Sequence, residues 1–274
     1  MPRINEAERK TQNRVLSLFQ DKAGLNYTYL GDLHGQINTN IIEDRLTAWL
    51  TSPKGGGHSR SIADKAVLKL TKAAGNLQQG LYKANQNVYS LLKYGAKVHE
   101  NPGDPDKTVY FIDWEYSHHN EFAVAEEVTV KSGSERRPDL VVYINGIAVA
   151  VIELKKSTVS ISQGIRQNLS NQSEHFNKPF FTTIQFVMAG NTGEGLRYAA
   201  IETPEKYYLE WKNDTVNTAS QPLDDVSLDI LEKCKSLPDK LDRQLFSMFQ
   251  KRRFLDLIHN FIVFDKGVKK GLPP

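Results

Sequence analysis

The stretch RRPDLVVYINGIAVAVIELKK, residues 136–156, decides the fold that the sequence predicts. Between Asp139 and Glu153 no residue carries a charge, and runs of Val, Ile and Tyr flank a central Asn145-Gly146. Uncharged β-branched runs on either side of Asn-Gly are typical of a β-hairpin. Strands without charges usually lie inside a sheet, buried on both faces. The sequence therefore predicts a buried hairpin that carries charged residues at its open end.

The open end of this hairpin carries Asp139, Glu153 and Lys155. Charged groups at the end of a buried hairpin are costly unless they are paired or bind a cation. Glu153 and Lys155 are two residues apart on one strand, so their side chains leave the same face. Asp139 lies on the other strand, and its face depends on the turn.

The length of the turn decides whether Asp139 and Glu153 share a face. A two-residue loop would place Asp139 opposite Ile152, on the wrong face of the hairpin. A three-residue loop with a left-handed Gly146 places Asp139 opposite Val151, diagonal to Glu153 at about 7–8 Å. We therefore predict the three-residue bulged turn, or else a bend near the proline that precedes Asp139.

Two carboxylates on one face suit a hard cation. Mg²⁺ takes oxygen ligands and keeps several waters, so one or two carboxylates suffice. It lowers the pKa of a bound water and neutralises charge that develops on a scissile phosphate. Lys155 would add positive charge beside the attacking water, and a buried lysine can shift toward base behaviour. On spacing alone, the alternative is an ordinary salt bridge among an Asp, a Glu and a Lys.

Pro138-Asp139 followed by Glu153-Leu154-Lys155 resembles the motif of PD-(D/E)xK nucleases. Together with SISQGIRQNLSNQ at 160–172, it resembles the nuclease domain of the R subunit of type I restriction-modification enzymes. The resemblance implies an α/β fold with a mixed central β-sheet flanked by helices. It also implies that the two acids are metal ligands, that the lysine is catalytic, and that Mg²⁺ is the cofactor.

The resemblance implies further site residues. Such nucleases often place another acid on an early helix, and Glu43 is the candidate, although it lies beside the apolar stripe of its helix and could be solvated. Gln167 matches the glutamine of a Q-x-x-x-Y element and is a candidate catalytic residue, but Asn171 stands where tyrosine is usual. Gln163, Gln167 and Asn171 form one amide stripe, which could contact phosphates or could be an ordinary polar face.

Basic residues near the motif are candidates for DNA binding. Arg136 and Arg137 precede it, with Lys131 close by, and Arg166 lies on the helix expected after Lys155. The net charge is only +3, so local patches would have to make the phosphate contacts. The implied substrate is double-stranded DNA, and the implied partners are the methylase and specificity subunits of a restriction-modification complex.

Composition limits the class of protein. The chain has 274 residues, of which 24% are charged and 39% hydrophobic, as in ordinary soluble proteins. Its longest apolar run, Ile147 to Ile152, is too short to span a bilayer, and its N-terminus lacks a signal-peptide core. The single cysteine, Cys234, excludes an internal disulfide and fits a reducing cytosol. We therefore expect a cytoplasmic protein that does not associate with membranes.

Hydrophobic periodicity and turn residues outline the elements. We expect helices over 5–21, 40–50, 60–74, 77–94, 160–176, 226–236 and 239–262. Strands are expected over 26–30, 108–113, 121–130, 181–189, 196–201 and 206–211, in addition to the hairpin. In this outline an endonuclease domain covers 1–212, a polar linker covers 213–225, and a helical segment covers 226–274.

The same resemblance bears on ATP. In the R subunits that this sequence resembles, an ATP-driven DNA translocase begins at about the position of the last residues, 267–274. The last helices are therefore expected to lead toward a motor domain absent from this chain. No G-x-x-x-x-G-K-[ST] phosphate loop occurs in the sequence. ATP is therefore expected as a cofactor only of a full-length subunit that carries the motor.

Two other functions stay open. The domain could be a non-catalytic DNA-binding or subunit-docking module in which the acids are structural. A metallophosphatase built on Asp32 and His34 ranks last, because the later metal-binding blocks of that class are missing from the sequence.

Overall fold

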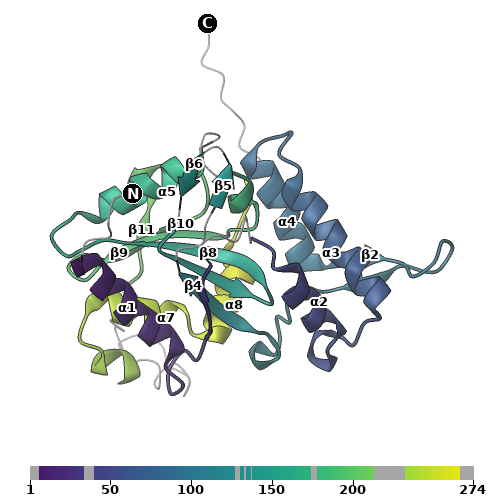
Figure 1. Cartoon of the computed structure of the whole chain (residues 1–274), viewed down its shortest axis with the longest axis horizontal. Helices are drawn as coiled ribbons and strands as arrows, with labels where there is room; N and C mark the ends of the chain where they lie inside the picture. Colours follow the sequence, from purple (N-terminus) through teal and green to yellow (C-terminus); the bar gives the residue numbers. More distant parts are fainter. Residues whose placement is uncertain are drawn as a thin grey trace, which may run out of the picture.

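A computed structural model describes residues 6–33, 40–126, 130–132, 134–136, 138–173, 178–212 and 232–265. Its centre is a seven-stranded mixed sheet in the order β1-β4-β7-β8-β9-β10-β11 (Figure 1). The strands are β1 Thr28–Asp32, β4 Phe122–Glu126, β7 Leu140–Ile144, β8 Ile147–Leu154, β9 Phe186–Asn191, β10 Gly195–Ala199 and β11 Leu209–Glu210. Two small ladders, β2 Ala96–Val98 with β3 Lys107–Val109 and β5 Val130–Ser132 with β6 Ser134–Arg136, lie apart from it. The predicted α/β fold with a mixed central sheet is confirmed.

Helices cover both faces of this sheet (Figure 1). One face packs against α1 Glu6–Gln20, α7 Lys240–Met248 and α8 Lys251–Phe261, and the other against α5 Ile161–Asn171. Three more helices, α2 Glu43–Thr51, α3 Arg60–Gly75 and α4 Leu81–Tyr94, lie beyond the turn of the β7–β8 hairpin (Figure 1). None of the helices in the described ranges combines the length and the apolar content that crossing a bilayer requires.

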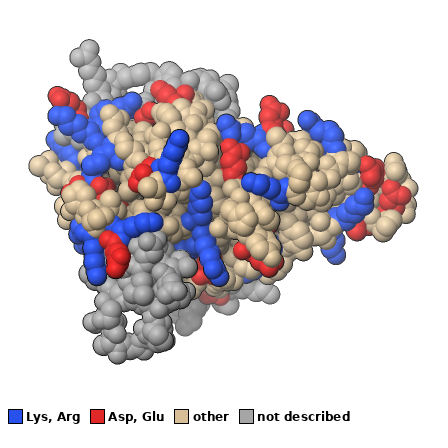
Figure 2. Space-filling view, turned by 90° about the horizontal axis from the view of Figure 1, so that it is seen from below, with Lys and Arg blue, Asp and Glu red and all other residues tan. Residues whose placement is uncertain are grey.

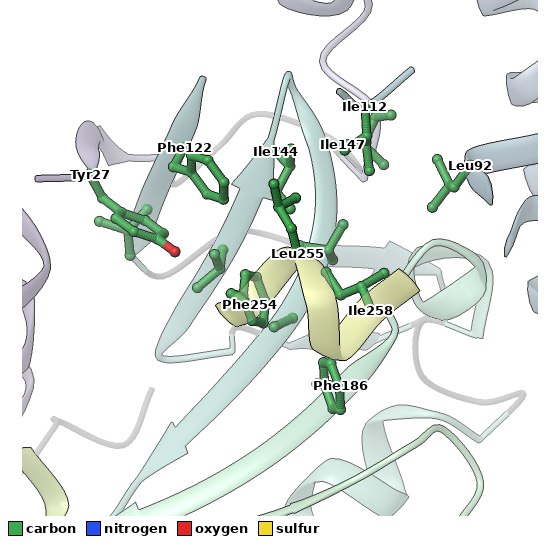
Figure 3. Packing of buried hydrophobic residues seen from close by; sticks show 14 of the residues in the cluster. Tyr27, Leu92, Ile112, Phe122, Ile144, Ile147, Phe186, Phe254, Leu255 and Ile258 are labelled. Carbon is green, nitrogen blue, oxygen red and sulfur yellow. The ribbon is translucent and has the colours of Figure 1, made fainter. Parts of the chain in front are cut away.

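The C-terminal helices belong to the main hydrophobic core. Figure 3 shows Phe254 and Ile258 of α8 beside the apolar side chains of the sheet. The single helix expected over 239–262 is broken, because Gln250 is extended and turns α8 back onto the sheet. This break allows Phe249 and Phe254 to pack ring against ring at 4.6 Å, both fully buried. The expected linker, 213–225, lies outside the described residues.

The turn of the central hairpin differs from the prediction. Asn145 and Gly146 have φ angles of 52° and 82°, and Ile144 pairs directly with Ile147. Left-handed geometry at both central residues defines the tight two-residue turn that Asn-Gly favours. The three-residue bulged turn that we predicted is therefore wrong.

A bulge inside β8 nevertheless gives the face that the site needs. Tyr143 pairs with Ala148, but Val142 pairs with Ala150, so Val149 is the extra residue. A bulge shifts the register by one and moves every later side chain to the other face. The bulge lies where the partner of β8 on the side away from β7 changes. Ile147 bridges to residue 41, whereas Ala150 already pairs with β9.

We expect the tight turn to depend on glycine at position 146. An added Cβ would lie 2.9 Å from the Ile42 carbonyl oxygen, on a backbone with positive φ. We expect Gly146→Ala to lower the free energy of unfolding by about 2–3 kcal/mol. Gly103 also has positive φ but has nothing within 4 Å of an added Cβ, so Gly103→Ala should cost about 1 kcal/mol. Urea unfolding of both variants measures the difference, and equal losses would contradict the close contact with Ile42.

Candidate active site

The open end of the hairpin brings the two motif acids together. Leu140 pairs with Ile152, so the same register places Asp139 opposite Glu153. Asp139 Oδ2 accepts a hydrogen bond of 2.6 Å from the backbone N–H of Leu154. Because residues directly opposite each other share a face of the sheet, both carboxylates lie on the α5 side. Their proximity follows from the bulge at Val149 and not from the turn.

Glu153 is fully buried and carries an unsatisfied oxygen. Its Oε1 accepts a hydrogen bond of 3.2 Å from Asn171 Nδ2. Its Oε2 has no hydrogen-bond partner among the residues that the structure describes. Burial, and then the charge of Asp139, raise the pKa of Glu153 well above its ordinary value. A buried carboxylate oxygen without a partner, beside a second carboxylate, is the donor set that suits a cation.

Lys155 remains a cation at this site. Its Nζ lies 3.1 Å from Glu8 Oε1, and its side chain is mostly buried. Burial would lower the pKa of Lys155, but the charges of Asp139, Glu153 and Glu8 outweigh it, and the pKa is raised. The shift toward base behaviour that a buried lysine can show is therefore not found. The raised pKa favours the protonated form of Lys155.

Helix α1 contributes two residues that the sequence analysis missed. Glu8 contacts Lys155, and Gln12 Nε2 donates hydrogen bonds to the backbone oxygen of Asp139, at 3.3 Å, and to Glu126, at 3.1 Å. Glu8 and Lys155 are 147 residues apart in the chain. The local sequence predicts the helix but carries no signal for these contacts.

Glu43 does not reach the two motif acids. It begins α2 and accepts a hydrogen bond from Thr71, and the neighbouring Ile42 N–H donates to the Gly146 carbonyl oxygen at 2.8 Å. Gly146 forms the closed end of the hairpin, about 20 Å along the strand from Glu153. The early-helix acid at the open end is Glu8.

The three amides of the predicted stripe, all on α5, do not point in the same direction. Gln163 and Gln167 line a cleft of about 390 Å³ together with Glu8, Lys155, Lys156 and Val159. Asn171 instead points into the interior toward Glu153. The cleft therefore adjoins the end of the hairpin through Lys155 and Glu8, with amide side chains along one wall.

The structure gives less information about the basic residues that were predicted to bind DNA. Arg166 is exposed and pairs with Glu205 at 2.8 Å. Arg136 ends β6, but its side chain and all of Arg137 lie outside the described residues, as does His34 of the metallophosphatase alternative. On the face seen in Figure 2, basic and acidic side chains are interspersed.

The site does not form a closed metal cage. Within the described ranges, no three or more His, Cys, Asp or Glu side chains are grouped so that they could hold a metal ion by themselves. Two carboxylates beside an open cleft are sufficient for a hard cation that keeps much of its water. The residues present therefore fit an ion such as Mg²⁺ better than a fully enclosed structural metal.

Comparison with known proteins agrees with this arrangement. A family model described as the type I restriction enzyme R protein N terminus matches residues 3–206. The chain belongs to this family. It is similar to the putative type I restriction enzyme MjaIXP endonuclease subunit of Methanocaldococcus jannaschii, with 26% identity over 75% of this chain and 20% of the relative. It is also similar to the type I restriction enzyme HindI endonuclease subunit of Haemophilus influenzae, with 24% identity over 96% of this chain and 24% of the relative. The chain thus spans about a quarter or less of the length of these relatives.

The raised pKa of Glu153 predicts how this family member's stability depends on pH. Below the ordinary value of 4.5 the carboxyl is neutral in both folded and unfolded states, so its contribution to stability is fully present. That contribution is lost as the pH rises through the higher pKa of the folded state. With divalent ions chelated, we expect Glu153→Gln to raise the free energy of unfolding near neutral pH by about 1 kcal/mol or more.

Thermal unfolding at several pH values measures this effect, and the advantage of Glu153→Gln should shrink toward pH 4.5. The exposed Glu232 provides the control, because Glu232→Gln makes the same substitution on the protein surface. A Glu153→Gln protein that is less stable than the wild type near neutral pH would contradict the raised pKa.

Proposed function

We propose that this chain is a nuclease domain that hydrolyses phosphodiester bonds of double-stranded DNA with Mg²⁺ as its cofactor. The observation that carries the proposal is the pairing of Asp139 with Glu153 at the open end of the hairpin. The unpartnered Oε2 of Glu153 and the neighbouring Lys155 support a site for a cation and a phosphate. The family match supports the same class of reaction, since the relatives are named endonuclease subunits.

Asp139 and Glu153 would hold the divalent ion through their carboxylate oxygens. When bound there, Mg²⁺ supplies electrostatic stabilisation of the phosphate and lowers the pKa of water. Lys155, whose raised pKa keeps it protonated, would place its ammonium against a phosphate oxygen and stabilise the charge that develops in the transition state. Gln167, on the wall of the cleft, would hydrogen-bond the phosphate or the attacking water.

Glu8 would have to share Lys155 with the substrate. In the structure its carboxylate pairs with the Lys155 ammonium at the edge of the cleft. A phosphate that enters the cleft would compete with Glu8 for that ammonium. Glu8 would then be available as a further oxygen donor on the cation side of the cleft, the role that the sequence analysis gave to Glu43.

The wider assignment rests on the family. We infer a cytoplasmic protein that acts with methylase and specificity subunits of a restriction-modification complex, which would supply the recognition of sequence. Arg136, Arg137 and Arg166 are candidates for contacts to the DNA backbone. The pairing of Arg166 with Glu205 means that this arginine would have to exchange one anion for another.

A non-catalytic DNA-binding or docking module is the second candidate function. The buried and paired state of Lys155, which resembles a structural ion pair with Glu8, is the observation that favours it. Such a module would keep its affinity for DNA without any requirement for Asp139.

DNA cleavage under Mg²⁺ or Mn²⁺ titration tests the nuclease proposal. We expect Asp139→Ala and Lys155→Ala each to reduce the cleavage rate at least about 100-fold, because one removes a cation ligand and the other removes transition-state charge. Lys97→Ala, an exposed lysine on β2, should cleave like the wild type.

A DNA-binding assay on the same proteins separates the two functions. Cleavage by both site variants at the wild-type rate would refute the nuclease assignment. Binding of DNA by all the proteins, without metal-dependent cleavage by any, would favour the module.

A further inference from the structure

We propose that Asn171 is a positioning residue that orients the Glu153 carboxylate for the divalent cation. Its Nδ2 donates to Glu153 Oε1 at 3.2 Å, which leaves Oε2 as the oxygen available to a cation. Asn171 stands where the related nucleases are expected to carry tyrosine. The inference rests on the proposed function, because it assigns a role toward the same cation.

A buried carboxylate needs such a hydrogen bond to hold one orientation. The terminal torsion of a glutamate is broad and roughly two-fold, so the backbone and the strand register do not fix it. Of the charged neighbours of Glu153, Asp139 accepts the backbone N–H of Leu154, and Lys155 is directed toward Glu8 at 3.1 Å. The amide of Asn171 is therefore the polar group that restrains rotation of the Glu153 carboxylate from the α5 side.

The approach of α5 to the sheet explains why a short amide fits here. A Cβ added at Gly164 would lie 3.0 Å from Ala189 Cβ and 3.6 Å from Glu153 Cβ, so the helix and the sheet are nearly in contact. Asn171 follows Gly164 by seven residues, or about two helical turns, and lies on the same buried face. Asn171 is only 1% exposed. This packing of α5 on the sheet holds the Asn171 amide within hydrogen-bond reach of Glu153.

Neighbouring Asn168 provides a matched comparison. It is also fully buried on α5, and its Nδ2 donates to the backbone oxygen of Met188 at 2.7 Å. The two asparagines share helix, burial and side-chain chemistry, and they differ in whether they contact Glu153. Loss of either donor removes one buried hydrogen bond and should cost stability of similar size.

The test is binding of Mn²⁺ alone, without DNA, measured by electron paramagnetic resonance on the whole chain. The variants are Asn171→Leu and Asn168→Leu, since leucine keeps the volume and removes the amide. We expect Asn171→Leu to weaken Mn²⁺ binding about tenfold or more, the usual effect of losing a residue that orients a metal ligand. Asn168→Leu should bind within about twofold of the wild type.

Thermal unfolding of the same proteins shows whether the two variants are equally destabilised, and Asn171→Ala replaces Asn171→Leu if leucine prevents folding. Equal Mn²⁺ affinity of the wild type and the Asn171 variant overturns the inference while the proposed function stands. Equal weakening by both asparagine variants also overturns it, because it would reflect a loosened helix. A wild type that binds no Mn²⁺ overturns the proposed function, and the inference fails with it.

Discussion

The whole site depends on the electrostatic cost of one buried carboxylate. Glu153 is at the end of an interior strand, with its Oε2 lacking a protein partner among the described residues. Burial and the charge of Asp139 both raise the pKa of Glu153. Such a group is stable as an anion only if a cation lies beside it. The surrounding elements can be understood as the framework that holds this group and Asp139 on one face.

The bulge at Val149 sets the register of that framework. Without the extra residue, the tight turn at Asn145-Gly146 would place Asp139 opposite Ile152, on the other face from Glu153. With it, the hairpin keeps the favourable turn and still places the acids opposite each other. The bulge coincides with the change of partner along β8, from the bridge with Ile41 to pairing with β9.

Two helices from distant parts of the chain complete the site from opposite faces of the sheet. α1 contacts the site through Glu8 and Gln12, and an ion pair from Arg14 to Asp242 of α7 attaches α1 to the C-terminal helices. α5 lies close to β8 at Gly164 and supplies both the amides of the cleft and Asn171. The C-terminal helices therefore affect the site indirectly, by supporting α1 and the sheet in one core.

Much of the fold could be predicted from local patterns. The helical periodicity over 60–74, 77–94 and 160–176 located α3, α4 and α5, because each buries an apolar face, although α5 ends at Asn171. Boundaries were less accurate where tertiary contacts override periodicity. The expected helix over 239–262 is broken at Gln250, where the chain turns back toward the sheet.

For the candidate site, the sequence by itself identified the two acids, the lysine and their hairpin, because charge at the end of an uncharged hairpin is a local pattern, but the spacing alone left an ordinary salt bridge open. Only the tertiary structure decided how they come to share a face, since a bulge depends on which segments flank the strand. It also decided that Glu8 and not Glu43 reaches the site, and that Asn171 turns inward. Contacts between residues far apart in the chain depend on packing, which local spacing does not encode.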